Sequence, residues 1–256
     1  MVAQSDLAGK RILITGASSG LGRHFARLCA RHGAGLAIAA RRVHRLQELT
    51  HDLRALGASQ VLEIQLDVAD AGSIEACVAA AVDGLGGVDV LVNNAGTARD
   101  GSPLNQTAND FDAVMDVNLR GVWLMATACG RHWRDTGTGG AIVNVASVLG
   151  LRVAGGLAAY CVSKAAVVQM TKALALDLAR YAIRVNALAP GYFETEINAG
   201  FFETDTGRKM VQRIPMRRIG AFEDLDGPFL LLAGDASRYM TGAVIPVDGG
   251  HLVSSM

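Results

Sequence analysis

RILITGASSGLG, residues 11–22, joins a short apolar run to a glycine-rich turn. The run Arg11–Thr15 has the composition of a buried parallel strand, and Leu21, Phe25 and Leu28 then fall at helical spacing. In such a strand–turn–helix setting, glycines let the backbone approach a pyrophosphate, whose negative charge the helix N-terminus stabilises. The spacing is Gly-x-x-x-Gly-x-Gly rather than Gly-x-Gly-x-x-Gly. The stretch predicts a dinucleotide-binding loop.

Further short apolar runs alternate with amphipathic stretches along the rest of the chain. They span 36–40, 61–66, 88–92, 141–146, 183–189 and 243–247. This alternation predicts an α/β fold, with a doubly wound parallel sheet of about seven strands and helices on both faces. No linker, repeat or low-complexity tract divides the chain, so we expect one domain over residues 1–256. The most irregular segment, about 192–218, is rich in charge and carries several phenylalanines, and we interpret it as a substrate lid.

Composition excludes several function classes. The 24 basic residues balance the 24 acidic ones, so nothing indicates a nucleic-acid or anionic-membrane surface. The start of the chain lacks the apolar core of a signal peptide, and no segment reads as a membrane span, which predicts a cytoplasmic protein. The four cysteines form no Cys-x-x-Cys pair and the six histidines do not cluster, so we expect reduced packing cysteines and no metal site.

A second motif pairs a phenol with an ammonium. Tyr160 and Lys164 are four residues apart in a segment with helical apolar spacing, so both side chains lie on one face, one turn apart. A free phenol has a pKa near ~10 and is a poor acid or base at neutral pH, but a fixed cation beside it favours the phenolate. The pair therefore predicts proton transfer, although a Tyr-x-x-x-Lys pair on its own is more often a surface feature.

With both motifs in place, the chain resembles the short-chain dehydrogenase/reductase family over essentially its whole length. These enzymes have a Rossmann-type fold and bind a nicotinamide dinucleotide. Four positions match the family's catalytic set, with the serine thirteen residues before the tyrosine: Asn118, Ser147, Tyr160 and Lys164.

The resemblance also implies which residues hold the cofactor. They are Gly16, Ser18, Ser19, Gly20, Leu21 and Gly22 in the loop, Asp67 and Val68 on the adenine side, Asn94, Ala95 and Gly96 after the fourth strand, Tyr160 and Lys164, and Pro190, Gly191 and Thr195 on the nicotinamide side. Arg41 and Arg42 follow the second strand, where Ala40 stands in place of an acidic residue that would hold the ribose of NAD. Arginine suits the 2′-phosphate of NADP, so we expect NADP(H) in preference to NAD(H).

The resemblance implies a division of roles within the catalytic set. Tyr160 would donate its proton to the substrate oxygen as hydride arrives, and would take it back in the oxidative direction. Lys164 would lower the pKa of the tyrosine and contact the nicotinamide ribose. Ser147 would hydrogen-bond the carbonyl oxygen, while Asn118 would bend its helix and hold a water that links Lys164 to solvent.

The substrate stays open at this point. Residues expected to touch it are Ser147, Leu149, Val153, Tyr160, Tyr192 and Phe193. A carbonyl reductase, including a 3-oxoacyl-thioester reductase, and an NAD(H)-linked sugar or polyol dehydrogenase are both compatible with this set. A dinucleotide-binding regulator without turnover is the rival from another class, although such proteins usually lack the tyrosine or lysine. Helices around 110–133 and 157–181 carry more apolar positions than a surface helix needs, so we expect a homotetramer.

Overall fold

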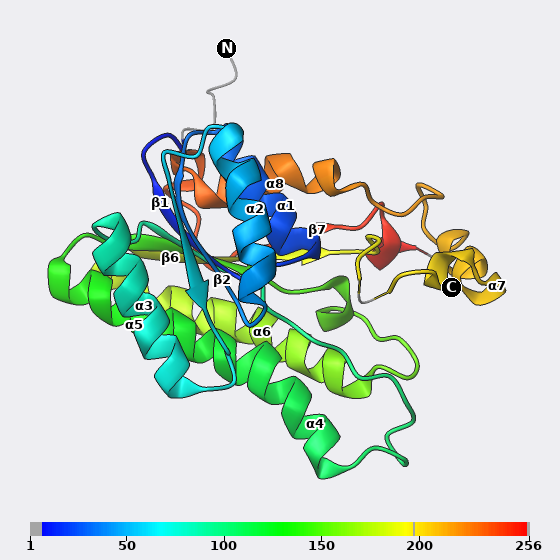
Figure 1. The fold of residues 1–256 in the computed structure, drawn as a ribbon. Helices are drawn as coiled ribbons and strands as arrows, with labels where there is room; N and C mark the ends of the chain where they lie inside the picture. Colours follow the sequence, from blue (N-terminus) through cyan, green and yellow to red (C-terminus); the bar gives the residue numbers. More distant parts are fainter. Residues whose placement is uncertain (1–6, 197, 255–256) are drawn as a thin grey trace.

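The computed structural model describes residues 7–196 and 198–254, and its core is a sheet of seven parallel strands in the order β3-β2-β1-β4-β5-β6-β7 (Figure 1). The strands are β1 (Arg11–Thr15), β2 (Gly35–Ala40), β3 (Gln60–Gln65), β4 (Val90–Asn93), β5 (Gly140–Val145), β6 (Ile183–Pro190) and β7 (Val244–Val247). The predicted sheet is confirmed, and the strand ends agree with the sequence interpretation to within two residues.

Helices cover both faces of this sheet. On one face lie α1 (Gly20–Arg31), α2 (Val43–Ala55) and α8 (Asp226–Ala233), and on the other lie α3 (Ala71–Leu85), α5 (Gly121–Thr136) and α6 (Ala158–Leu178) (Figure 1). Each helix layer encloses its own apolar core against the sheet. All six residues of β2 are buried, as continuous apolar strands require when both faces are covered.

The strand order reverses between β1 and β4. From β1 the chain winds outward through β2 to β3, and it then returns to the centre and winds the other way from β4 to β7. The loops leaving β1 and β4 diverge to opposite faces at this switch point, which opens a crevice at the carboxyl edge of the sheet. The strand order alone therefore determines where in the molecule a ligand-binding crevice lies.

The helix before β5 is interrupted by one wide turn. α4 (Ala108–Met115) begins at Thr107 with a capping box to Asp110, and α5 continues the same course, but residues Asp116–Arg120 form a π-helix between them. Such turns hold one extra residue and are frequent at functional sites. The distortion expected at Asn118 corresponds to this turn, and it leaves the Asn118 side chain fully buried.

The segment expected to form a lid follows β6 and lies beyond the edge of the sheet. It contains α7 (Asp205–Val211), which Figure 1 shows projecting from the end of the molecule. Residue 197 within this segment and residues 1–6 at the start of the chain lie outside the described residues. In the part of the chain that the structure describes, no helix is both long and apolar enough to cross a membrane.

Candidate active site

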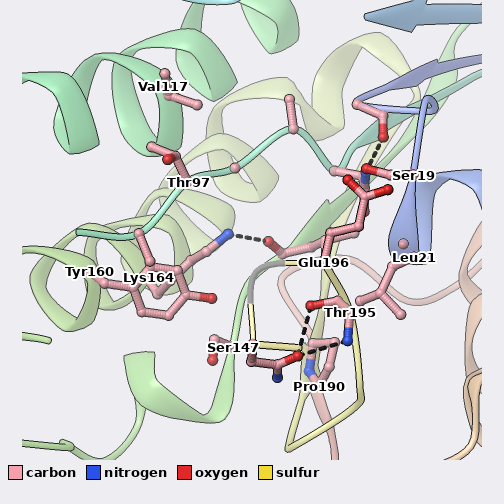
Figure 2. A pocket seen from close by; sticks show the side chains of 18 of the residues that line it. Ser19, Leu21, Thr97, Val117, Ser147, Tyr160, Lys164, Pro190, Thr195 and Glu196 are labelled. Atoms are coloured by element: carbon pink, nitrogen blue, oxygen red, sulfur yellow. Dashed lines mark hydrogen bonds between the residues drawn. The ribbon is translucent and has the colours of Figure 1, made fainter. Parts of the chain in front are cut away.

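A cleft of about 1320 Å³ runs along the carboxyl edge of the sheet. Its walls come from the loops that follow β1 to β6 and from the segment after β6, and Figure 2 shows the side chains inside it. Of the residues expected to bind cofactor or substrate or to act in catalysis, all line this cleft except Gly22, Asn118 and Val153. Groups from distant parts of the sequence therefore meet in one place.

The glycine-rich loop is shaped by close backbone packing. Gly16 has a φ of +68°, and a Cβ atom there would come within 2.8 Å of the Ala95 Cα. At Gly22 a Cβ would collide with the Asn94 amide and the Gly16 carbonyl, so Gly22 packs α1 against the loop instead of facing the cleft. Small residues at both positions keep the N-terminus of α1 open to a ligand.

Polar contacts tie the ends of β1 and β4 together beside this loop. The Thr15 hydroxyl accepts hydrogen bonds from the backbone N–H groups of Asn94 (3.0 Å) and Ala95 (3.1 Å). In return, the Asn94 side chain donates to the carbonyls of Thr15 (3.0 Å) and Gly16 (3.2 Å). The two loops that border the crevice are thus fixed relative to each other.

Tyr160 and Lys164 share one wall of the cleft with Ser147 (Figure 2). Tyr160 lies in the first turn of α6, and the Lys164 Nζ lies 5.7 Å from the centre of its ring. Ser147 lies two residues after the end of β5, and its hydroxyl oxygen accepts from the Leu149 N–H at 3.1 Å, which fixes the rotamer. The end of one strand and the start of one helix therefore bring two hydroxyls and an ammonium together.

Lys164 is almost completely buried, and it has no acidic partner among the described residues. Its Nζ donates a hydrogen bond to the Val145 carbonyl at 2.8 Å (Figure 2). Burial lowers the pKa of this ammonium to about 8, because removal from water disfavours the charged form. The lysine is therefore poised to change charge close to neutral pH.

The pKa of Tyr160 shifts opposite to the sequence expectation. Burial raises the pKa of the phenol, and the neighbouring Ser147 hydroxyl offsets only part of this effect. We expected the Lys164 charge to lower the pKa, but the ammonium lies over the ring and donates to Val145 instead of contacting the phenol oxygen. Burial therefore favours the protonated form of the Tyr160 phenol.

Asn118 connects three elements from beneath the cleft. Its amide nitrogen donates to the Thr97 carbonyl (2.8 Å) and to the Ser163 hydroxyl (3.0 Å), and its oxygen accepts from the Thr97 N–H (2.8 Å). Ser163 in turn donates to the Tyr160 carbonyl at 2.8 Å. The wide turn thereby fixes the β4 loop and the first turn of α6. The expected water link to Lys164 remains a prediction.

A buried polar chain that the sequence did not reveal lies behind the site. The Asn93 amide donates to the Asn144 side-chain oxygen (3.0 Å), and the Asn144 amide donates to the Thr171 hydroxyl (3.0 Å). The three residues belong to β4, β5 and α6, and all are buried. Satisfied polar groups in an apolar core specify one arrangement of these elements. Asparagine within an apolar strand is the only sequence signal for it.

Two arginines approach the far end of the cleft from β2. Arg42 donates to the hydroxyls of Ser18 (3.2 Å) and Ser19 (2.9 Å), and it forms a salt bridge with Glu196. Arg41 lines the cleft without a side-chain hydrogen bond or salt bridge to any described residue. Ala40 ends the strand, so no carboxylate stands at that position. This end of the cleft therefore presents two guanidinium groups, and no carboxylate ends the strand that leads to it.

Four large apolar or aromatic side chains also line the cleft: Leu149, Leu157, Tyr192 and Phe193. All but Leu157 are among the residues expected to touch the substrate, and that contact remains a prediction. Val153 does not line the cleft: its side chain is 81% exposed, because its loop turns outward before Ala154 to Leu157 return to the cleft. This expectation for Val153 was wrong.

All four cysteines are buried and unpaired, and burial raises the pKa of the Cys29, Cys77 and Cys129 thiols. Cys29, Cys77 and Cys129 pack in the two main apolar cores, whereas Cys161 packs in a smaller cluster with Leu149 and Tyr160, which line the cleft. Over the described residues, no three of the His, Cys, Asp and Glu side chains are grouped as a metal site would require.

Known proteins with similar sequences are oxidoreductases. A family model described as enoyl-(acyl carrier protein) reductase matches residues 16–251. L-rhamnose 1-dehydrogenase (NAD(P)(+)) of Azotobacter vinelandii is 38% identical over 255 residues, which cover 97% of this chain and 98% of that protein. 3-Oxoacyl-(acyl-carrier-protein) reductase of Thermotoga maritima is 39% identical over 247 residues, or 96% and 99% of the two chains.

Solved structures of similar fold are also dehydrogenases. A gluconate 5-dehydrogenase from Burkholderia cenocepacia, solved in complex with NADP and tartrate, superposes with a TM-score of 0.93 at 35% identity, with 98% of each chain covered. The chain belongs to the short-chain dehydrogenase/reductase family. It is an NAD(P)-dependent oxidoreductase that acts on CH–OH groups.

The burial of Lys164 can be measured directly. We expect the ε-carbon resonance of one lysine in ¹³C-lysine-labelled protein to titrate with a midpoint of about 8, and this titration to be absent from the Lys164→Met variant. Methionine keeps the apolar stem, so the variant should fold. A Lys164 midpoint near the free value of ~10.4 would show that water reaches the ammonium.

Proposed function

We propose that this enzyme interconverts a ketone and a secondary alcohol with NADP(H), using Tyr160 as general acid and base. The observation that carries the proposal is the convergence of Tyr160, Lys164 and Ser147 on one wall of a cleft whose far end presents Arg41 and Arg42. The cleft fits a dinucleotide. Gly16 places no side chain in the glycine-rich loop, and the N-terminus of α1 follows that loop. No carboxylate stands at the end of β2. When bound, the nicotinamide supplies or accepts the hydride.

In the reductive direction, the residues of this chain polarise and protonate the carbonyl oxygen. Ser147 and Tyr160 carry the two hydroxyls that can donate to it, and the burial that raises the tyrosine pKa keeps the proton available. Lys164 holds a positive charge on the same wall below a pH of about 8, which favours the phenolate that remains after transfer. In the oxidative direction that phenolate takes the proton back. Asn118 positions Tyr160 through Ser163.

Two substrate classes are candidates, the first within this proposal and the second as its alternative. The apolar walls at Leu149, Leu157 and Phe193 favour a carbonyl substrate with a hydrocarbon part, as in a 3-oxoacyl thioester, and a 3-oxoacyl reductase is among the relatives. An NAD(H)-linked sugar or polyol dehydrogenase is the second candidate, favoured by the relatives named for L-rhamnose and gluconate. A regulator without turnover no longer fits, because the chain belongs to a family of enzymes and retains all four catalytic positions.

The role of Tyr160 is tested by removing only its hydroxyl. Tyr160→Phe should lower turnover on an accepted ketone at least ~100-fold while NADPH still binds, because general acid–base catalysis is typically worth 10²–10⁴. Lys164→Ala should damage both turnover and cofactor binding. The control is Tyr181→Phe, outside the cleft. Near-wild-type turnover by Tyr160→Phe in an NADPH oxidation assay would contradict the assignment.

Cofactor choice is tested at Arg41. NADPH should bind at least ~10-fold tighter than NADH, because charge-assisted hydrogen bonds to the 2′-phosphate are each worth roughly 1.5–3 kcal/mol. Arg41→Ala should erase most of this preference in a fluorescence titration. Arg54→Ala changes an exposed arginine at the other end of α2 and should leave the preference unchanged. Equal affinities of the wild type for the two cofactors would refute the NADP(H) assignment.

We also propose a homotetramer. Trp123, Val162 and Leu176 on α5 and α6 are 48%, 52% and 81% exposed, and a further subunit would remove this apolar surface from water. Light scattering at micromolar concentration should give four times the chain mass of 26.7 kDa. A monomer mass would contradict it.

A further inference from the structure

A carboxylate from the lid segment already occupies the arginine cluster at the cofactor end of the cleft. Glu196 Oε1 accepts from Arg45 Nη1 at 2.6 Å, and its Oε2 accepts from Arg42 Nη1 at 3.2 Å. Glu196 also lines the cleft, and in Figure 2 it lies toward the wall that carries Ser19. The contact joins segments more than 150 residues apart in the sequence.

The guanidinium of Arg42 is thereby engaged on two sides. Its Nη2 donates to the hydroxyls of Ser18 and Ser19 in the glycine-rich loop, while its Nη1 faces Glu196. Arg41, next to it, makes no such contact with the described residues. A phosphate arriving at this end of the cleft thus meets one available arginine and one that a carboxylate already holds.

We propose that Glu196 competes with the 2′-phosphate of NADP(H) for Arg42, with Arg45 as its anchor, and so limits how strongly the enzyme discriminates against NAD(H). The inference rests on the proposed NADP(H) function. Carboxylate and phosphate oxygens bind the guanidinium fork in the same way, so both cannot take the same N–H groups of Arg42. NAD(H) carries a ribose hydroxyl instead of this phosphate and leaves Glu196 in place.

The difference in charge between the phosphate and the carboxylate determines which of them holds Arg42. A 2′-phosphate brings up to two negative charges and displaces the single charge of Glu196, but the salt bridges must break first, and any carboxylate that stays nearby repels the phosphate. The partners are half-exposed, with Glu196 at 54%, Arg42 at 41% and Arg45 at 37%, so water and salt weaken each pair. We therefore expect an effect of about three- to tenfold on binding rather than a switch.

The test removes the charge of Glu196 and keeps its shape. In fluorescence titrations of the full-length protein, Glu196→Gln should lower the Kd for NADPH about three- to tenfold and change the Kd for NADH less than about twofold. The matched control is Glu194→Gln, which removes an exposed charge two residues away, outside the cleft. It should leave both constants within about twofold, because the Glu194 carboxylate forms no salt bridge or hydrogen bond with Arg42 or any other described residue, whereas that of Glu196 contacts Arg42 and Arg45.

A second background identifies the route of the effect. In an Arg42→Ala protein, adding Glu196→Gln should change NADPH binding less than about twofold, because the contested partner is gone. An equal gain in both backgrounds would show that Glu196 acts by charge alone, and the inference would be wrong. Raising the salt concentration should shrink the difference between wild type and Glu196→Gln.

The outcomes separate this inference from the function on which it rests. If wild type prefers NADPH and Arg41→Ala removes the preference, but Glu196→Gln binds NADPH as wild type does or more weakly, only the inference falls. An equal gain for NADPH and NADH would also overturn it, because the variant would then have loosened the lid generally. A wild type that binds both cofactors equally would remove the proposed NADP(H) function and the inference together.

Discussion

The common direction of the seven strands is the constraint on which the rest of the molecule depends. Because both faces of the sheet are covered by helices, its interior admits apolar side chains and a few fully paired polar ones. Only the carboxyl edge is left for chemistry, and every loop that follows a strand reaches that edge. The reversal of strand order between β1 and β4 then opens the edge where ligand can enter.

Burying Lys164 at this edge of the sheet lowers the stability of the folded protein. The Lys164 ammonium has one hydrogen bond, to the Val145 carbonyl, and almost no contact with water. The charged form is therefore less stable in the folded protein than in water, which is why its pKa is lowered. In the unfolded chain the lysine would keep its proton to a higher pH, so the cost to folding is present below about pH 8 and disappears as pH rises toward ~10.4. The enzyme thus tolerates a stability penalty at neutral pH to keep a cation beside Tyr160.

The sequence predicted the fold well because its signals are local. Apolar runs identify the strands, and the glycines after Thr15 identify the loop between β1 and α1. The placement of Tyr160 beside Lys164 also follows from local helical spacing. Contacts between distant segments left no such signal: neither the pairing of Glu196 with Arg42 nor the link from Asn118 to Ser163 can be read from spacing.

Two expectations were wrong, those for the pKa of Tyr160 and for the position of Val153, because both depend on which groups surround the side chain in the folded protein. The pKa of Tyr160 depends on burial, which a sequence does not report, and burial outweighs the neighbouring charge that the sequence does show. Val153 looked like a pocket residue because it is apolar and close to Leu149 in sequence, but the direction of its loop points it into solvent. Helical periodicity gives no help within such loops.

The wide turn at Asp116–Arg120 makes the geometry of the site depend on the number of residues as well as on their kind. One extra residue in a regular α-helix would rotate everything before it by about 100° relative to everything after it, whereas the wide turn takes up that residue locally. Asn118 can therefore face the core while α4 and α5 both keep their apolar sides inward. A single insertion or deletion between Thr107 and Thr136 would change the phase of this helix and turn Asn118 away from Thr97 and Ser163.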